Sequence, residues 1–284
     1  MNPIHPQTQI GVVSLTVADF RRSLPYYTQK IGLRLLNQSG NKATLGTAVQ
    51  PLLELIEKPG STVPRGTTGL FHFALLVPSR LELARTFKNL VDTEAPLGGF
   101  SDHSVSEAIY LSDPDGNGIE IYRDRTREEW PYLNGRLQMN TMPLDLQSLV
   151  GELSGQETQW AGLHQNTKMG HIHLHIRDLD EAEAFYCDAL GFERVMRYGT
   201  AAGFVSAGGY HHHIGLNTWA GKNAPPPPAG SAGLRHYQIL LPDQAALNGA
   251  EDRLGQNSVS YEKKNGTLIL QDPSQNSIQL TVTP

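Results

Sequence analysis

The chain has 284 residues, of which 39% are hydrophobic and 18% charged, and a formal net charge of −5 at pH 7. This composition is typical of a globular protein, and it excludes a broad basic surface for nucleic acid or an anionic membrane. The single cysteine excludes an intramolecular disulfide, and no apolar run approaches the roughly 18 residues of a membrane-spanning helix, so a cytoplasmic location is expected.

The first predicted elements are a strand, a helix and two further strands. Residues 12–17 alternate as in a strand, and residues 19–31 carry apolar side chains at helical spacing. Gly32 is well placed to end that helix. Residues 42–46 and 51–57 have the pattern of strands.

The same order of elements restarts near residue 70. A strand is expected over residues 70–76, a helix over 80–90, and strands over 105–111 and 118–122. The segment DPDGNG at 113–118 indicates a tight hairpin turn between the last two strands. Each of these stretches is therefore interpreted as a βαβββ module.

The second half of the chain repeats the first. Residues 11–33 match 170–192 and residues 113–122 match 272–281, both with a shift of 159 positions, and residues 69–78 match 233–242. Such a period is too long for a solenoid and indicates a duplicated domain. The sequence thus predicts an α+β fold of four βαβββ modules: one at about 9–60, two at 68–125, three at 168–222 and four at 232–284.

Two interruptions complete the predicted domain plan. Residues 126–167 are interpreted as a linker between an N-terminal domain at 1–125 and a C-terminal domain at 168–284, with one helix expected near 144–153. The proline-rich segment 224–233 is expected to be a loop between modules three and four.

Module three is rich in histidine. Side chains two residues apart on a strand share a face, and two such sets occur: His171, His173 and His175 on the first strand, and His211, His213 and Gly215 on the last, with His212 opposite. Three imidazoles on one strand are unusual in a packed core. The cluster favours a metal site or acid–base chemistry.

Module two adds a carboxylate. His72 lies on its first strand and Glu120 on its last, where Ile119 and Ile121 flank the acid. A carboxylate is costly to bury unless it is paired or binds a metal. Two imidazoles and one carboxylate with open positions are the ligand set of non-haem iron(II) enzymes.

These residues carry a family resemblance. The repeated opening (LTVADFRRSLPYYTQKIGL and LHIRDLDEAEAFYCDALGF), GLFHFALLVP, DHSVSEAIYLSDPDGNGIEIY and GGYHHHIGLNTWAGKNAPP resemble the vicinal-oxygen-chelate superfamily of glyoxalases, bleomycin-resistance proteins and extradiol dioxygenases. The set is most similar to bacterial catechol-2,3-dioxygenases of the CatE type. The resemblance implies that paired modules form two cup-shaped, half-open barrels, with metal ligands on their first and last strands.

The pairing of modules decides which ligands meet. If sequence neighbours pair, one barrel holds Glu54, His72 and Glu120, the other holds His171, His236 and Gln279, and both sets are incomplete. If module two pairs with three, as in members that exchange modules, His72, Glu120 and His171 form a complete metal site. Module one then pairs with four, and Val12, Glu54, His236 and Gln279 form a vestigial site. We favour the exchanged pairing.

The resemblance implies an extradiol dioxygenase that uses Fe²⁺ to open a catechol-like aromatic diol with dioxygen, with Mn²⁺, Zn²⁺ or Ni²⁺ as other candidate metals. Tyr110, ten residues before Glu120, is expected to bind the substrate, and His213 and His103 are the acid–base candidates. Strict strand alternation places His103 and Tyr110 on opposite faces unless a bulge intervenes.

Two other functions stay open at this point. A glyoxalase-type lyase or isomerase would use two histidines and two glutamates, and Gly215 removes one of the glutamates from the favoured site. A metal-free binding protein of the bleomycin-resistance kind would leave the buried acid and imidazoles without partners. Nucleic acid and membrane partners are not expected, whereas a homodimer is compatible with the fold.

Overall fold

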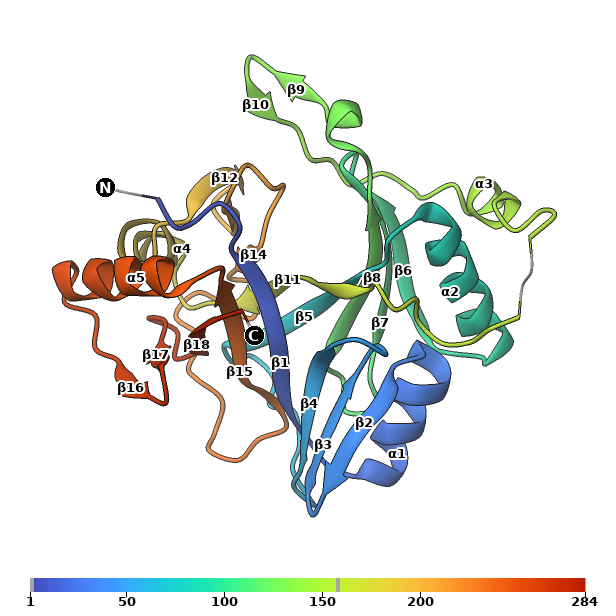
Figure 1. Ribbon diagram of the computed structural model, residues 1–284, viewed down its shortest axis with the longest axis horizontal. Helices are drawn as coiled ribbons and strands as arrows, with labels where there is room; N and C mark the ends of the chain where they lie inside the picture. The colour runs from blue at the N-terminus through green and yellow to red at the C-terminus, as the bar shows by residue number, and fades with distance from the viewer. Residues whose placement is uncertain (1–2, 157–158, 284) are drawn as a thin grey trace. The chain divides into compact units, whose positions relative to one another are not determined.

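The computed structural model describes residues 3–156 and 159–283; residues 157 and 158, inside the predicted linker, lie outside this description. The predicted α+β fold is confirmed. The strands form two curled eight-stranded sheets, in the orders β16-β17-β18-β15-β1-β4-β3-β2 and β12-β13-β14-β11-β5-β8-β7-β6, and a two-stranded ribbon, β10-β9 (Figure 1). The chain divides into two compact units, which we name by their position in the sequence: the central unit (Val17–Thr62 and His72–Met169) and the terminal unit (Met1–Thr16, Val63–Phe71 and Gly170–Pro284).

The central unit contains modules one and two apart from β1 and the first residues of β5. Its elements are α1 (Phe20–Pro25), the π-helical turn η1 (Tyr26–Ile31), β2 (Arg34–Ser39), β3 (Lys42–Gly46), β4 (Pro51–Glu57), α2 (Arg80–Asp92), β6 (Leu97–Asp102), β7 (Ser106–Ser112), β8 (Gly118–Asp124), the 3-10 turn η2 (Arg127–Glu129), β9 (Tyr132–Leu133), β10 (Arg136–Leu137) and α3 (Leu146–Gly151). Strand β5 (Gly69–Leu76) enters this unit at His72 and runs parallel to β8.

The terminal unit contains modules three and four. Its elements are β1 (Gln9–Val17), β11 (Lys168–His175), α4 (Leu179–Glu183), the π-helical turn η3 (Ala184–Ala189), β12 (Glu193–Tyr198), β13 (Ala202–Ser206), β14 (Ile214–Asn217), β15 (Gly233–Leu241), α5 (Gln244–Gln256), β16 (Glu262–Lys264), β17 (Thr267–Gln271) and β18 (Ser277–Val282). In modules three and four the first strand is parallel to the last, as β5 is to β8 in module two: β11 is parallel to β14 and β15 to β18.

Strand β1 of module one pairs with β15 of module four. The two strands are antiparallel, with Ser14 opposite His236 and Val13 opposite Tyr237, and the register shifts twice along β1. The backbone N–H of Val12 donates to Oε1 of Gln238, 226 residues further along the chain. The exchanged pairing of module one with module four is therefore confirmed.

One element of the linker was not predicted. Strands β9 and β10 form a short hairpin whose turn residues, Asn134 and Gly135, have φ values of 51° and 73°. Two consecutive positive φ angles are what a two-residue type I′ hairpin requires, and Asn-Gly is its preferred sequence. The dipeptide was the signal for this hairpin. The linker helix α3 lies inside the expected range.

A buried carboxylate fixes the turn before the last strand in both halves of the chain. Asp113 accepts the phenolic O–H of Tyr27 (2.8 Å), the side-chain N–H of Asn117 (2.9 Å) and two turn backbone N–H groups. Asp272 accepts the corresponding bonds from Tyr186 (3.0 Å) and Asn276 (2.9 Å). The repeated DP turn thus ties the helix of one module to the hairpin of the next.

The duplication extends further than the sequence comparison indicated. Ile4 donates its N–H to the carbonyl of Gly191, and Leu163 donates in the same way to Gly32, both at 2.8 Å. A turn follows in each case, from His5 to Thr8 and from His164 to Thr167. The last residues of the predicted linker are therefore a copy of the segment that precedes β1.

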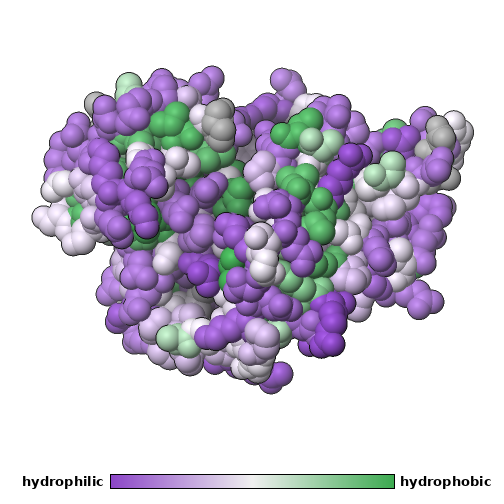
Figure 2. All heavy atoms as spheres, turned by 60° about the horizontal axis from the view of Figure 1, so that its bottom comes forward, coloured by the Kyte–Doolittle hydropathy of each residue, from purple (hydrophilic) through white to green (hydrophobic). Residues whose placement is uncertain are grey.

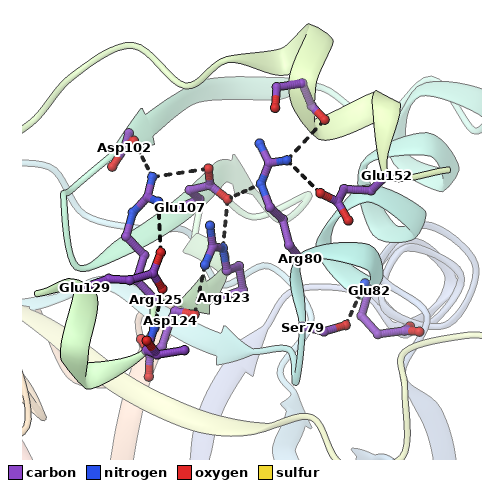
Figure 3. A network of polar contacts seen from close by, with 12 residues as sticks. Ser79, Arg80, Glu82, Asp102, Glu107, Arg123, Asp124, Arg125, Glu129 and Glu152 are labelled. Atoms are coloured by element: carbon purple, nitrogen blue, oxygen red, sulfur yellow. Dashed lines mark hydrogen bonds and ion pairs between the residues drawn. The ribbon is translucent and has the colours of Figure 1, made fainter. Parts of the chain in front are cut away.

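An ion-pair network covers the outer face of the β7–β8 hairpin (Figure 3). The carboxylate of Glu107 on β7 accepts from Arg80 of α2 and from Arg123 of β8, both at 2.8 Å, and lies 3.4 Å from Arg125. Burial alone would raise the pKa of Glu107, but the guanidinium donors outweigh burial and lower it. The network joins helix α2 to the two strands.

The surface seen in Figure 2 is mainly hydrophilic, with apolar side chains exposed between polar ones. Among residues 3–156 and 159–283, no helix combines the length and the apolar composition needed to cross a bilayer.

We predict that Tyr27→Phe and Tyr186→Phe each destabilise the protein by about 1–2 kcal/mol, because each removes a hydrogen bond to a buried carboxylate. Urea denaturation measures the change, with Tyr198→Phe, at a tyrosine that is 68% exposed, as control. Equal stability of Tyr27→Phe and Tyr198→Phe would show that the hydrogen bond from Tyr27 to Asp113 does not stabilise the protein.

We predict that Glu107→Gln lowers stability at pH 7 by about 2 kcal/mol, since it removes charge-assisted hydrogen bonds. Because the folded-state pKa of Glu107 is lowered, its contribution is present above the pH near 4.5 at which the unfolded group titrates, and it is lost as pH falls through the folded-state pKa. Denaturation midpoints of the two proteins should therefore converge in acid. A constant difference from pH 7 to pH 3 would contradict this assignment.

Candidate metal and substrate site

The inner face of the β7–β8 hairpin carries Tyr110 and Glu120. These residues are directly opposite each other in the antiparallel register, three positions from the Glu107–Arg123 pair on the outer face. Odd spacing along a strand reverses the face, so the ion-pair network and the two inner residues lie on opposite sides of the same hairpin. Only 2% of Glu120 is exposed.

His72 on β5 lies beside the buried carboxylate. Its Nε2 is 3.1 Å from Oε2 of Glu120, and its ring centroid is 5.8 Å from that of Tyr110. Both His72 and Glu120 are buried. An imidazole nitrogen and a carboxylate oxygen at this separation offer two adjacent ligands for a cation.

His103 reaches Tyr110 from the turn between β6 and β7. Its Nε2 lies 2.7 Å from the Tyr110 hydroxyl, and its Nδ1 lies 2.8 Å from the carbonyl oxygen of Asn140. The expected strand alternation does not apply, because His103 precedes β7 and Ser104 turns the chain with φ 67°. A turn, not a bulge, brings the two side chains together.

The hydrogen bonds of His103 restrict its protonation. The Asn140 carbonyl can only accept, so Nδ1 carries a proton, and Nε2 is the nitrogen that faces the Tyr110 hydroxyl. Burial, followed by the charge of Glu120 and a hydrogen bond with it, raises the pKa of Tyr110 well above its usual value. The phenol therefore stays protonated at neutral pH.

His171 on β11 is buried in the terminal unit. Its ring centroid is 4.1 Å from that of His212, and the next residue, Ile172, donates its N–H to the carbonyl of His213 at 3.1 Å. His212 was predicted to lie on the face opposite to His211 and His213. Here it contacts the proposed ligand directly.

The reason is that the strand expected over the histidine run is shorter than predicted. Strand β14 begins at Ile214, and His211 and His212 precede it in a bend, where alternation of faces fails. Nδ1 of His211 and Nδ1 of His212 share a hydrogen bond of 2.8 Å. His213 accepts the N–H of Ala207 at its Nδ1 (3.1 Å). No sequence signal marked His212 as the residue beside His171.

Because Gly215 has no side chain, the imidazole ring of His173 packs against it. A Cβ atom built at Gly215 would lie 2.7 Å from Cγ of His173 and 2.9 Å from its Nδ1. The position at which glyoxalase-type sites place a second glutamate is therefore covered by the ring of His173. A carboxylate at residue 215 would require that ring to move.

The residues predicted to form a vestigial site have other partners. Glu54 forms an ion pair with Lys42, and Val12 binds the side chain of Gln238 through its backbone N–H. Gln279 and Gln238 are neighbours in the parallel β15–β18 register. Gln279 matches Glu120 at the shift of 159. The second copy of the strand therefore carries a neutral amide where the first carries a carboxylate.

Comparisons with known proteins agree with this architecture. The chain is 45% identical over 278 residues to a catechol-2,3-dioxygenase of Bacillus subtilis (strain 168), and the match covers 96% of both chains. Glyoxalase I from Zea mays has a similar fold, with a TM-score of 0.57, 15% identity, and coverage of 96% of this chain and 92% of that one. The cppA protein from Streptococcus pneumoniae also has a similar fold, with a TM-score of 0.55, 13% identity and 99% coverage of each chain.

The model of one protein family matches both halves, at residues 9–121 and 168–280. These ranges contain all six of the residues predicted to bind metal or act in catalysis: His72, His103, Tyr110, Glu120, His171 and His213. The chain belongs to the Glyoxalase/Bleomycin resistance protein/Dioxygenase superfamily.

Proposed function

We propose that the protein is a metal-dependent extradiol dioxygenase that cleaves the ring of a catechol-like aromatic diol with dioxygen. Two observations support the reaction class: the 45% identity to a catechol-2,3-dioxygenase over nearly the whole chain, and the buried pair formed by His72 and Glu120. The single observation that carries the proposal is this pair, because a carboxylate in such a position needs a cation to offset its burial.

We propose that His72, Glu120 and His171 hold the metal. The three side chains are buried, and each offers one ligand atom: two imidazole nitrogens and one carboxylate oxygen. Two neutral imidazoles and one carboxylate fit a divalent iron ion and leave positions for other ligands. Bound Fe²⁺ would supply a Lewis acid and redox centre at which the diol and dioxygen meet. Mn²⁺, Zn²⁺ and Ni²⁺ are the alternatives that metal analysis distinguishes.

We propose that Tyr110 and His103 transfer a proton of the substrate. The Tyr110 hydroxyl keeps its proton because its pKa is raised, and while it donates that proton to His103 its oxygen can accept a hydrogen bond from a substrate hydroxyl. His103 accepts at Nε2 while its Nδ1–H bond to Asn140 holds the ring in place. The pair thus forms a route by which a proton at Oη of Tyr110 can pass to a histidine nearer the surface.

The acid–base role of His213 remains a proposal, to which the structure adds a competitor. The Nδ1 atom of His213 accepts the backbone N–H of Ala207, so this nitrogen already has a partner. His212 lies closer to the proposed ligand His171, with ring centroids 4.1 Å apart. Alanine variants of the two residues, compared for turnover at equal metal content, identify the one that moves a proton.

A glyoxalase-type reaction has less support. It would require a second carboxylate ligand, and the ring of His173 occupies the space at Gly215 where that side chain would begin. The likeness to glyoxalase I concerns the fold.

The first test is metal analysis of protein purified without oxygen. We expect about one iron per chain in the native protein, less than a tenth of that in His72→Ala and His171→Ala, since removal of one ligand from a three-residue set abolishes tight binding. His164→Ala, at a histidine of the connecting turn, is the control and should retain iron. Iron in all three variants, or none in the native protein, would refute the proposed site.

A second test concerns Tyr110. We predict that Tyr110→Phe lowers kcat for catechol about 100-fold, because it removes a donor positioned for proton transfer, while iron content is unchanged. Formation of the coloured ring-opened product from catechol in air gives the rate, and Tyr198→Phe is the matched control. A rate equal to that of the native protein would exclude Tyr110 from catalysis.

A further inference from the structure

Aromatic rings form a continuous surface on the sheet of module three. From His171, the next ring is His212 (centroids 4.1 Å apart), followed by Phe204 at 5.1 Å and His173 at 5.8 Å from Phe204. The row ends at Trp219, whose ring lies 5.5 Å from that of His173. All five residues belong to the terminal unit.

Phe71 completes the outer end of this row. Its ring packs edge-on against Trp219 and against His173, with centroid separations of 5.1 Å in both cases. Trp219 is 53% exposed and Phe71 is 36% exposed. Two large aromatic side chains thus present uncovered ring surface at the end of a row that begins at the proposed ligand His171.

The position of Trp219 is fixed by hydrogen bonds. Its backbone N–H donates to Oδ1 of Asn217 at 3.0 Å, and the same oxygen is 2.7 Å from Nδ1 of His175. The preceding residue, Thr218, donates its N–H to the carbonyl of Ala201. An exposed indole on an ordered turn is a preorganised contact surface, since little conformational entropy is lost when a ligand binds.

The row of rings places Trp219 and Phe71 one ring beyond His173. Phe71 directly precedes His72 on β5, and His173 is two residues after His171 on β11. A strand advances about 3.3 Å per residue, so two residues span about 7 Å. A diol held by its two oxygens would direct its ring substituents over a distance of this order.

We propose that Trp219 and Phe71 form an apolar wall that binds the ring substituent of the diol and so selects catechols with flat hydrophobic substituents over unsubstituted catechol. The inference rests on the proposed dioxygenase function, and it adds a substrate preference and two specificity-determining residues to it. Aromatic side chains favour edge-to-face and offset contacts with a flat apolar group.

Steady-state kinetics with 4-phenylcatechol and catechol test the wall. We expect Trp219→Ala to raise KM for 4-phenylcatechol about tenfold relative to KM for catechol, because the variant loses an apolar contact with the phenyl group. Trp219→Phe should restore most of the preference. Tyr198→Ala, at an exposed ring of the same unit, is the control. An equal effect of Trp219→Ala on both diols would overturn the proposal.

Fluorescence provides a readout that does not depend on turnover. Trp219 is one of three tryptophans in the chain. Without oxygen, 4-phenylcatechol should quench the native protein more strongly than catechol does, and the difference should disappear in Trp219→Phe. If neither diol is cleaved but this selective quenching is present, the proposed dioxygenase function is wrong and the proposed contact with Trp219 is supported. If both diols are cleaved and quenching does not depend on Trp219, the proposed contact with Trp219 is wrong and the dioxygenase function is supported.

Discussion

The carboxylate of Glu120 is the constraint around which the central unit is organised. A buried acid needs partners, and the chain provides them on a hairpin that fixes the side chain from both faces. On the inner face, Tyr110 lies opposite Glu120 and His72 lies 3.1 Å away. On the outer face, the Glu107 network joins the same two strands to α2 (Figure 3). The outer network thus supports the two strands from which Tyr110 and Glu120 project.

Duplication produced two sets of matching positions, and only one set carries all of the proposed metal ligands. Both halves retain the buried aspartate and its tyrosine and asparagine donors, so this hydrogen-bonded group is a requirement of the fold. The copies differ on the face that would meet a ligand: Ile269 opposite Gln279 replaces Tyr110 opposite Glu120, and Val12 replaces His171. The residues of the proposed site therefore differ between the matching positions, while the framework that supports them is the same.

Much of this arrangement could be predicted from the sequence, because strand alternation, helical spacing and the 159-residue shift are local or repeated patterns. The repeated βαβββ order and the pairing of β1 with β15 are confirmed. Two details could not be predicted. The bend at His211 and His212 and the turn at His103 both depend on where a strand begins, and a shift of one residue reverses the face of a side chain. The metal ligands and the domain boundaries at 125 and 168 stay predictions.

The pairing of β1 with β15 also has a consequence for synthesis of the chain. The hydrogen bond between Val12 and Gln238 closes a loop of 226 residues, so the first strand emerges from the ribosome long before its partner exists. Closing so large a loop is slow, and until then β1 presents an unpaired edge that can associate with other chains. Neither half can complete a sheet alone. The nascent polypeptide therefore has to remain protected from aggregation until translation is nearly finished.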